Sequence, residues 1–161
     1  MAFGPLGPRF SWRGFYTQAS SLAFRTFDNQ FQDFTDRDVG LGRNFADNDQ
    51  LSLMVTVPVL ANWLLTPELT LLRQGEGRIQ DPYPPSGSAE LGSTPQLFIG
   101  TVERSYRAAL GIHGSIRPVQ LTANLGYHRI SNAGHMDGRT ETRFQGRLFV
   151  TVGTSRRGRL P

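Results

Sequence analysis

The stretch QLFIGTVERSYRAALGIHGSIR, residues 96–117, alternates between apolar and polar side chains. Successive side chains of a β-strand point to opposite faces, so this period of two predicts one long strand over 96–117. At about 3.3 Å per residue it would extend roughly 70 Å, far beyond the usual strand of about 5 to 6 residues. Arg104 is the one clear exception on the apolar side. The length favours a membrane-spanning β-barrel.

The same alternation recurs along the rest of the chain. It predicts further strands over about 10–27, 51–61, 64–78, 119–130 and 139–153. Between them, residues 28–50, 80–95 and 131–138 are rich in Asp, Pro, Gly or Asn and predict long loops. We therefore predict an all-β fold: an antiparallel up-and-down transmembrane β-barrel, or a partial barrel, of about six to eight strands, in a single domain over 1–161.

The predicted connections alternate in length. Tight turns are expected near Asn62-Trp63 and at Arg117-Pro118, with the long loops between them. Pro58 and Pro67 lie close to the first turn, and proline is tolerated at strand ends, edges and bulges. Bacterial barrels have short periplasmic turns and long extracellular loops, so this alternation favours the same class.

The polar faces of two predicted strands carry full charges. These residues are costly against a dry core and comfortable beside water, which predicts that they face a polar lumen. The alternative is a soluble β-barrel that binds an apolar ligand, in which Trp12 and Tyr16 would be core aromatics and the arginines would point outward. The predicted lumen-facing residues are Glu103, Arg107, Glu141, Arg143 and Arg147.

Composition excludes several classes of protein. No stretch approaches the roughly 18 consecutive apolar residues of a membrane helix, and cysteine is absent, which excludes disulfides and thiolate metal sites. The formal net charge is +4, but all 17 basic residues are arginines spread along the chain, so no nucleic-acid partner is expected. Residues 1–8 lack the pattern of a secretory signal, and we expect an exported form to be a mature chain or a fragment.

Two glycine-rich pieces point to a family. FTDRDVGLGRNFADND at 34–49 and LLRQGEG at 71–77 resemble the C-terminal part of Wzi-type capsule-assembly outer-membrane β-barrel proteins, and the segment from Asn132 to Phe144 is loosely similar to their closing hairpin. The barrels of that family are longer than this chain. The resemblance implies a place in the bacterial outer membrane, contact with the lipid bilayer, and a role in attaching or assembling surface polysaccharide.

The acidic loop over 28–50 is the expected contact surface for polysaccharide, because carboxylates accept hydrogen bonds from sugar hydroxyls. A pore for small solutes is the alternative among membrane proteins. Further barrel strands would come from a longer chain or from another copy. The expected polysaccharide-binding residues are Asp33, Asp36, Arg37, Asp38, Arg43, Asp47 and Asp49.

No enzyme, cofactor or metal is expected. The chain lacks the nucleophile elbow Gly-x-Ser-x-Gly, a phosphate-binding glycine loop and the metal motif HExxH. His128, His135 and Asp137 lie near one loop without metal-ligand spacing, and the acidic loop lacks the register of a calcium loop. Glu68 with Glu76, or Glu103 with Glu141, could form an acid/base pair, but ion pairing with the surrounding arginines is the expected state of all four.

Overall fold

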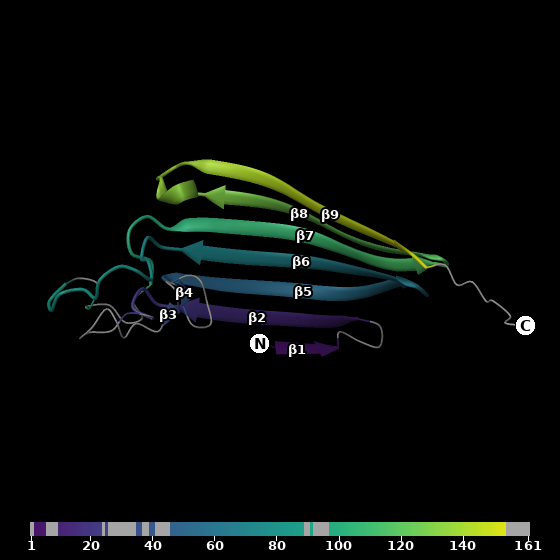
Figure 1. The fold of residues 1–161 in the computed structure, drawn as a ribbon, viewed down its shortest axis with the longest axis horizontal. Coiled ribbons are helices and arrows are strands. Elements are labelled where there is room, and N and C mark those ends of the chain that lie inside the picture. Colours follow the sequence, from purple (N-terminus) through teal and green to yellow (C-terminus); the bar gives the residue numbers. More distant parts are fainter. Residues whose placement is uncertain are drawn as a thin grey trace, which may run out of the picture.

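Seven strands form one antiparallel sheet (Figure 1). The computed structural model describes residues 2–5, 10–23, 25, 35–36, 39–40, 46–88, 91 and 97–153. Among these residues there is no helix with the length and hydrophobicity of a membrane span. The sheet strands are β1 (Ala2–Pro5), β2 (Ser11–Ala19), β5 (Asn48–Leu60), β6 (Trp63–Gln74), β7 (Glu103–Ile116), β8 (Val119–Ser131) and β9 (Thr140–Val152).

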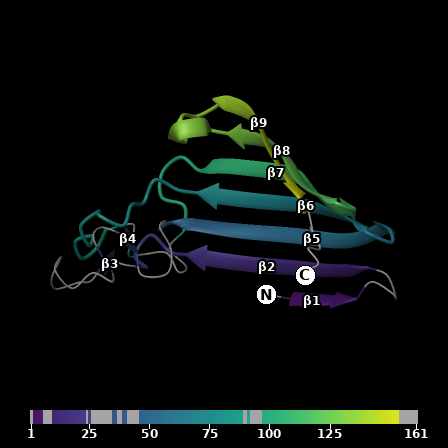
Figure 2. The same ribbon diagram turned by 45° about the vertical axis from the view of Figure 1, so that its right-hand side comes forward.

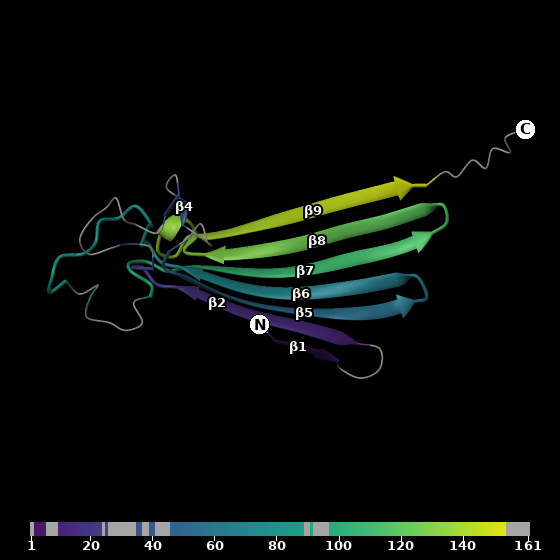
Figure 3. The same cartoon turned by 60° about the horizontal axis from the view of Figure 1, so that its bottom comes forward.

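Each strand of the sheet pairs with its neighbours in chain order, which gives β1-β2-β5-β6-β7-β8-β9. A separate two-stranded sheet joins β3 (Thr35–Asp36) to β4 (Val39–Gly40). The large sheet does not close: β1 and β9 lie at opposite edges (Figure 3). The predicted all-β, antiparallel up-and-down fold of six to eight strands is confirmed, and the open sheet is consistent with a partial barrel.

The two ends of the sheet differ, as Figures 1 and 2 show. At the turn end, residues 61–62 join β5 to β6 and residues 117–118 join β7 to β8. At the loop end, 75–102 join β6 to β7 and 132–139 join β8 to β9, the latter through a 3-10 turn at Ala133–His135. The predicted alternation of short and long connections is confirmed. The register shifts between Pro58 and Leu60, whereas Pro67 stays paired with Leu110.

Four predicted strand boundaries were wrong, one of them the end of the strand predicted over 64–78, because β6 ends at Gln74. The strand predicted over 96–117 begins only at Glu103, because Phe98 and Gly100 both have a φ of 67°, which no strand accommodates. Its 14 residues extend about 46 Å. The strand predicted over 10–27 is β2 and ends at Ala19, while residues 24 and 26–27 lie outside the described part. β5 already begins at Asn48 inside the predicted loop 28–50, and β1 was not predicted.

The register gathers apolar side chains on one face of the sheet. Leu53, Leu69, Ala108, Tyr127 and Phe144 are successive cross-strand partners from β5 to β9, and the rows toward the turn end are also mostly apolar. We call this the apolar face. Its strand residues further include Trp12, Gly14, Tyr16, Leu51, Val55, Val57, Trp63, Leu65, Leu71, Tyr106, Leu110, Ile112, Leu121, Leu125, Leu148 and Val150.

The opposite face is polar. The row next to the one above runs through Ser52, Thr70, Arg107, His128 and Arg143. We call it the polar face. In the described residues no second layer covers either side: the exposed fractions of Leu69, Leu148 and Phe144 are 61%, 65% and 73%. The buried hydrophobic residues of that part are small or peripheral, namely Ala19, Ala46, Ile79, Ile130 and Ala133.

Trp63 covers a glycine on the apolar face near the turn end. Gly114 is its cross-strand partner, and a Cβ on Gly114 would lie 2.3 Å from Trp63 Cδ2. The indole therefore occupies the space that any side chain at this position would need. At Gly146, also on the apolar face, the nearest atom to an added Cβ is Leu125 Cδ2 at 3.4 Å, which is ordinary contact.

Gly114→Ala is expected to lower the free energy of unfolding by roughly 1 to 3 kcal/mol, because the added methyl group displaces Trp63. Gly146→Ala is the matched control and should change it by less than about 0.5 kcal/mol. Equilibrium denaturant unfolding of both variants under the same conditions checks this. Equal stability of the two variants would contradict the packing of Trp63 over Gly114.

Candidate functional site

A chain of polar contacts crosses the polar face from β5 to β8. The hydroxyls of Ser52 and Thr70 lie 2.9 Å apart, and Thr70 donates to Glu68 Oε1 at 3.0 Å. Arg107 Nη1 donates to the same oxygen at 2.6 Å, while its Nη2 donates to Asn124 Oδ1 at 3.2 Å. Each strand supplies one or two members, so the network joins four strands on one side of the sheet.

A second ion-pair group lies on β9. Glu141 accepts hydrogen bonds from Arg139 Nη2 at 2.6 Å and from Arg143 Nη2 at 2.8 Å. Both arginines are about half exposed or more. These ion pairs therefore contribute little to the free energy of unfolding and chiefly restrain side chains at the edge strand. The expected ion pairing is confirmed for Glu68 and Glu141. Glu103 and Glu76 instead accept backbone amides, from Gly134 at 2.7 Å and from Thr101 at 2.9 Å.

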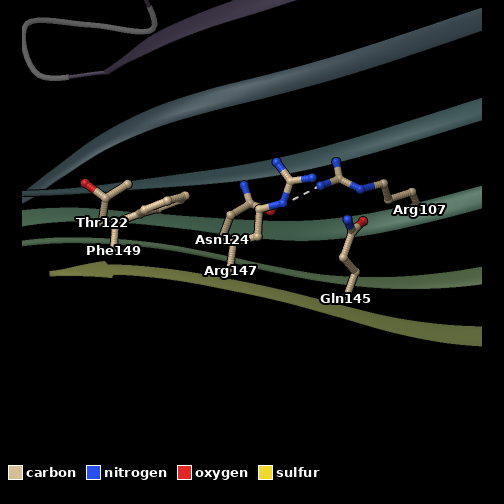
Figure 4. A pocket seen from close by; sticks show the side chains of 6 residues that line it. All are labelled: Arg107, Thr122, Asn124, Gln145, Arg147 and Phe149. Carbon is tan, nitrogen blue, oxygen red and sulfur yellow. Dashed lines mark hydrogen bonds between the residues drawn. The ribbon is translucent and has the colours of Figure 1, made fainter.

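A hollow of about 460 Å³ lies on the polar face over β7, β8 and β9 (Figure 4). Arg107 is tied to Glu68, but Arg147 makes no ion pair with the residues that the structure describes. The hollow therefore carries an excess of positive charge. Its lining residues are Arg107, Thr122, Asn124, Gln145, Arg147 and Phe149.

At the loop end, Asp47 binds segments that are far apart in the sequence. Its side chain is fully buried, and its carboxylate accepts the backbone amides of Gly77 at 3.1 Å, Ile99 at 2.9 Å and Phe98. Its carbonyl oxygen accepts the amide of Gly75 at 2.8 Å. Asp47 thus fastens the end of β5 to both ends of the connection between β6 and β7.

Next to Asp47, three strands meet in a second cluster. Arg73 Nε donates to Asp49 Oδ1 at 2.9 Å, and Arg73 Nη2 binds the other carboxylate oxygen. The Tyr16 hydroxyl donates to Asp49 Oδ2 at 3.2 Å. Arg73 also lies over the Phe98 ring, 4.7 Å from its centre, which is within range of a cation–π interaction.

A further hollow of about 450 Å³ lies within the connection between β6 and β7. Acidic and aromatic side chains line it together: Glu76 and Asp81 with Tyr83. Arg25 reaches it from the end of β2 and donates to Pro82 O at 3.1 Å. We call this the loop-end pocket. Its rim holds carboxylates and a phenol, which can accept and donate hydrogen bonds to hydroxyl groups.

The predicted polysaccharide-binding residues are only partly placed. Asp33, Arg37, Asp38 and Arg43 lie outside the described residues, and Asp36 is in β3. Asp47 and Asp49 are buried, with exposed fractions of 0% and 3%, because backbone amides and Arg73 already occupy their oxygens. These two carboxylates hold the protein together, and the contact of the acidic loop with polysaccharide stays a prediction.

The five predicted lumen-facing residues, Glu103, Arg107, Glu141, Arg143 and Arg147, do share one face, the polar face. The alternation also places the neutral residues Thr122, Asn124 and Gln145 on the polar side of their strands. Sequence reasoning missed only that they line one hollow together with Arg107 and Arg147, which depends on the register between strands.

The structure does not bring together His128 and His135, the two histidines that the sequence analysis considers for a metal site. His135 Nδ1 lies 2.8 Å from Thr101 O, and His128 sits in the polar row between Arg107 and Arg143. Among the described residues no three His, Asp or Glu side chains are placed to hold a metal ion.

Comparisons with protein-family models, with curated proteins and with solved structures yield no match for this chain. The resemblance to Wzi-type proteins therefore stays a prediction, and the functional argument rests on the geometry of the sheet and of its loop end.

Asp47→Asn is expected to loosen the loop end. The amide offers one acceptor oxygen where the carboxylate serves three backbone amides, and an unsatisfied buried donor costs about 1 to 3 kcal/mol. Hydrogen exchange at the Gly77, Phe98 and Ile99 amides should become faster. Asp81→Asn is the control: it removes charge from a side chain that accepts the Arg78 backbone amide and lies 3.9 Å from Arg25. Unchanged exchange in Asp47→Asn would contradict the anchoring role.

Proposed function

We propose that the chain forms part of the wall of a bacterial outer-membrane β-barrel that attaches or assembles surface polysaccharide. The observation that carries the proposal is the division of one uncovered sheet into an apolar and a polar face. Water-soluble sheets bury their apolar face against a second layer. An apolar face without such a layer suits hydrocarbon, and a charged polar face suits a watery interior.

The dimensions of the apolar face support this placement. From Tyr106 to Ile116 the face is apolar along β7, about 33 Å at 3.3 Å per residue. With the strand tilted by about 40° from the membrane normal, this length corresponds to a band only about 25 Å tall, the height typical of outer-membrane barrels. Tyr16 and Tyr106 lie toward the loop end of the band, while Trp63 begins β6 at the turn end. Aromatic girdles at both interfaces are typical of such barrels.

The hollow on the polar face supports an inward orientation of that face. Side chains of β7, β8 and β9, most of them polar or charged, line this open space. A barrel closed around the polar face would make the hollow part of a watery interior. The soluble alternative requires closure around the other face, with Leu69 and Phe144 inside.

Barrel closure needs strands beyond the seven described. Every backbone amide within a bilayer must be paired, and the outer edge of β9 has no partner among the described residues. We infer that further strands, from a longer chain or from another copy, pair with this edge and with the β1 edge.

The polysaccharide role rests on the loop end. The sequence resemblance implies it, and the loop-end pocket offers Glu76, Asp81 and Tyr83 for contact with sugar hydroxyls. Asp47 holds this region in place, so the pocket is built on an ordered support.

A pore for small anionic solutes is the second candidate function. The positively charged hollow with Arg107 and Arg147 favours it, because fixed arginines in a lumen attract anions. This alternative predicts clear ohmic steps in a planar bilayer. Such steps would contradict attachment of polysaccharide as the main role.

Membrane placement is tested by Leu148→Arg. Leu148 lies in the middle of the apolar face on β9, in the row of Leu65 and Ile112. The substitution is expected to lower the free energy of unfolding in lipid vesicles by roughly 2 to 4 kcal/mol, as for arginine at the bilayer midplane. Gln145→Arg, on the polar face of the same strand, should have little effect. If the chain stays in solution without detergent, or both variants behave alike, the placement is wrong.

Polysaccharide contact is tested by the double variant Asp81→Ala/Tyr83→Ala. We expect its affinity for purified capsular polysaccharide to fall about tenfold, because a hydrogen-bonding group and an aromatic contact are lost together. Binding to protein in vesicles is the measurement. Asp137→Ala, in the loop between β8 and β9, is the control. Equal affinity of the wild type and the double variant would exclude the loop-end pocket as the contact site.

A further inference from the structure

The apolar face carries charge at one end only. In the described strands its charged residues are Asp49, Arg73, Arg104 and Arg129, and all four lie at or next to the loop ends of β5 to β8. The middle and the turn end of this face carry none. Arg104, the exception to the sequence alternation, thus belongs to a group.

The three arginines are neighbours. Arg73 and Arg104 are direct cross-strand partners on β6 and β7, and Arg129 on β8 is opposite Tyr106, two residues along from Arg104. Direct partners on one face have Cβ atoms about 4.5 to 5.5 Å apart, and diagonal neighbours about 7 to 8 Å. Facing like charges destabilise a sheet pair. A cation cluster of this kind is favourable once an anion lies between the side chains.

Only one of the three is neutralised within the described residues. Asp49 binds Arg73, whereas Arg104 and Arg129 are exposed and make no ion pair or hydrogen bond there. The nearest acids by register, Glu103 and Glu141, belong to the polar face and are already engaged. The cluster therefore has room and charge for an anion.

We propose that Arg104 and Arg129 bind the phosphate group of a lipid headgroup, in the leaflet on the loop side. The inference rests on the proposed membrane placement. Each guanidinium can donate two parallel hydrogen bonds to phosphate oxygens. Arg129 is the cross-strand partner of Tyr106. Its long aliphatic side chain can place the guanidinium at the level of the headgroups.

The surroundings favour a lipid over free phosphate. Leu71 and Tyr106 are cross-strand partners directly beside the arginines, and Tyr127 follows on β8. These apolar and aromatic side chains suit the acyl chains below a bound headgroup, and tyrosine is enriched at this depth of a bilayer. A soluble anion would gain nothing from them.

The double variant Arg104→Gln/Arg129→Gln tests the inference. The chain in neutral detergent is titrated with phosphatidic acid and with the diacylglycerol of the same acyl chains, and bound lipid is counted by native mass spectrometry. We expect wild type to prefer phosphatidic acid, and the double variant to bind it at least about tenfold more weakly, since two charge-assisted contacts are lost. Arg13→Gln/Arg78→Gln, which removes equal charge from the polar face and a loop, should bind like wild type.

The outcomes separate this inference from the proposed function. Inorganic phosphate should not compete; full displacement would assign the cluster to a soluble anion and overturn the lipid site. If Leu148→Arg behaves as expected for a membrane strand but both double variants bind phosphatidic acid equally, the headgroup site is wrong and the membrane placement stands. If the wild-type chain stays in solution without detergent, both the membrane placement and the headgroup site are wrong.

Discussion

The continuous register from β2 to β9 is the constraint on which the structure depends. The sheet has no second layer in the described residues, so its two faces owe their character to backbone pairing alone. A slip of one residue in any strand would move that strand's apolar side chains to the polar face. The bonds from Ser52 to Asn124 and the packing of Trp63 on Gly114 then hold the register from opposite sides.

The two ends of the sheet have different structural roles. At the turn end, two-residue connections keep consecutive strands close and leave little beyond the sheet. At the loop end, Asp47 and the Arg73–Asp49 pair tie long connections down onto β5 and β6. Buried carboxylates are costly unless each oxygen is satisfied, and here backbone amides and a guanidinium supply the partners. Polar chemistry is thereby concentrated where the proposed contact surface lies.

Much of the fold could be predicted from the period-two pattern. It gave β5 to β9 nearly in full, the turns near Asn62 and Arg117, and the common face of Arg107, Arg143 and Arg147. It failed at residues 97–102, where the alternation continues but the positive φ of Phe98 and Gly100 breaks the strand. Side-chain parity carries no information about backbone dihedrals.

The site was harder to predict than the fold. Asp47 looks like any acid of a polar loop, and only the segments at Gly75–Gly77 and Phe98–Ile99 make it a buried anchor. Likewise Arg73, Arg104 and Arg129 lie on three strands, and the register that pairs Arg73 with Arg104 is concealed by the long connection over 75–102. Contacts between segments this distant in sequence leave no local pattern.

The β1 edge of the sheet has a consequence for how a cylinder could form. β1 covers β2 only from Ser11 to Gly14, which leaves Phe15 to Ala19 without a partner on that side among the described residues. This border is therefore stepped, whereas the β9 border is straight over 13 residues. An incoming strand must pair with this stepped border. The offset at which it pairs fixes the stagger of the strands, and the stagger determines their tilt and the diameter of a closed barrel.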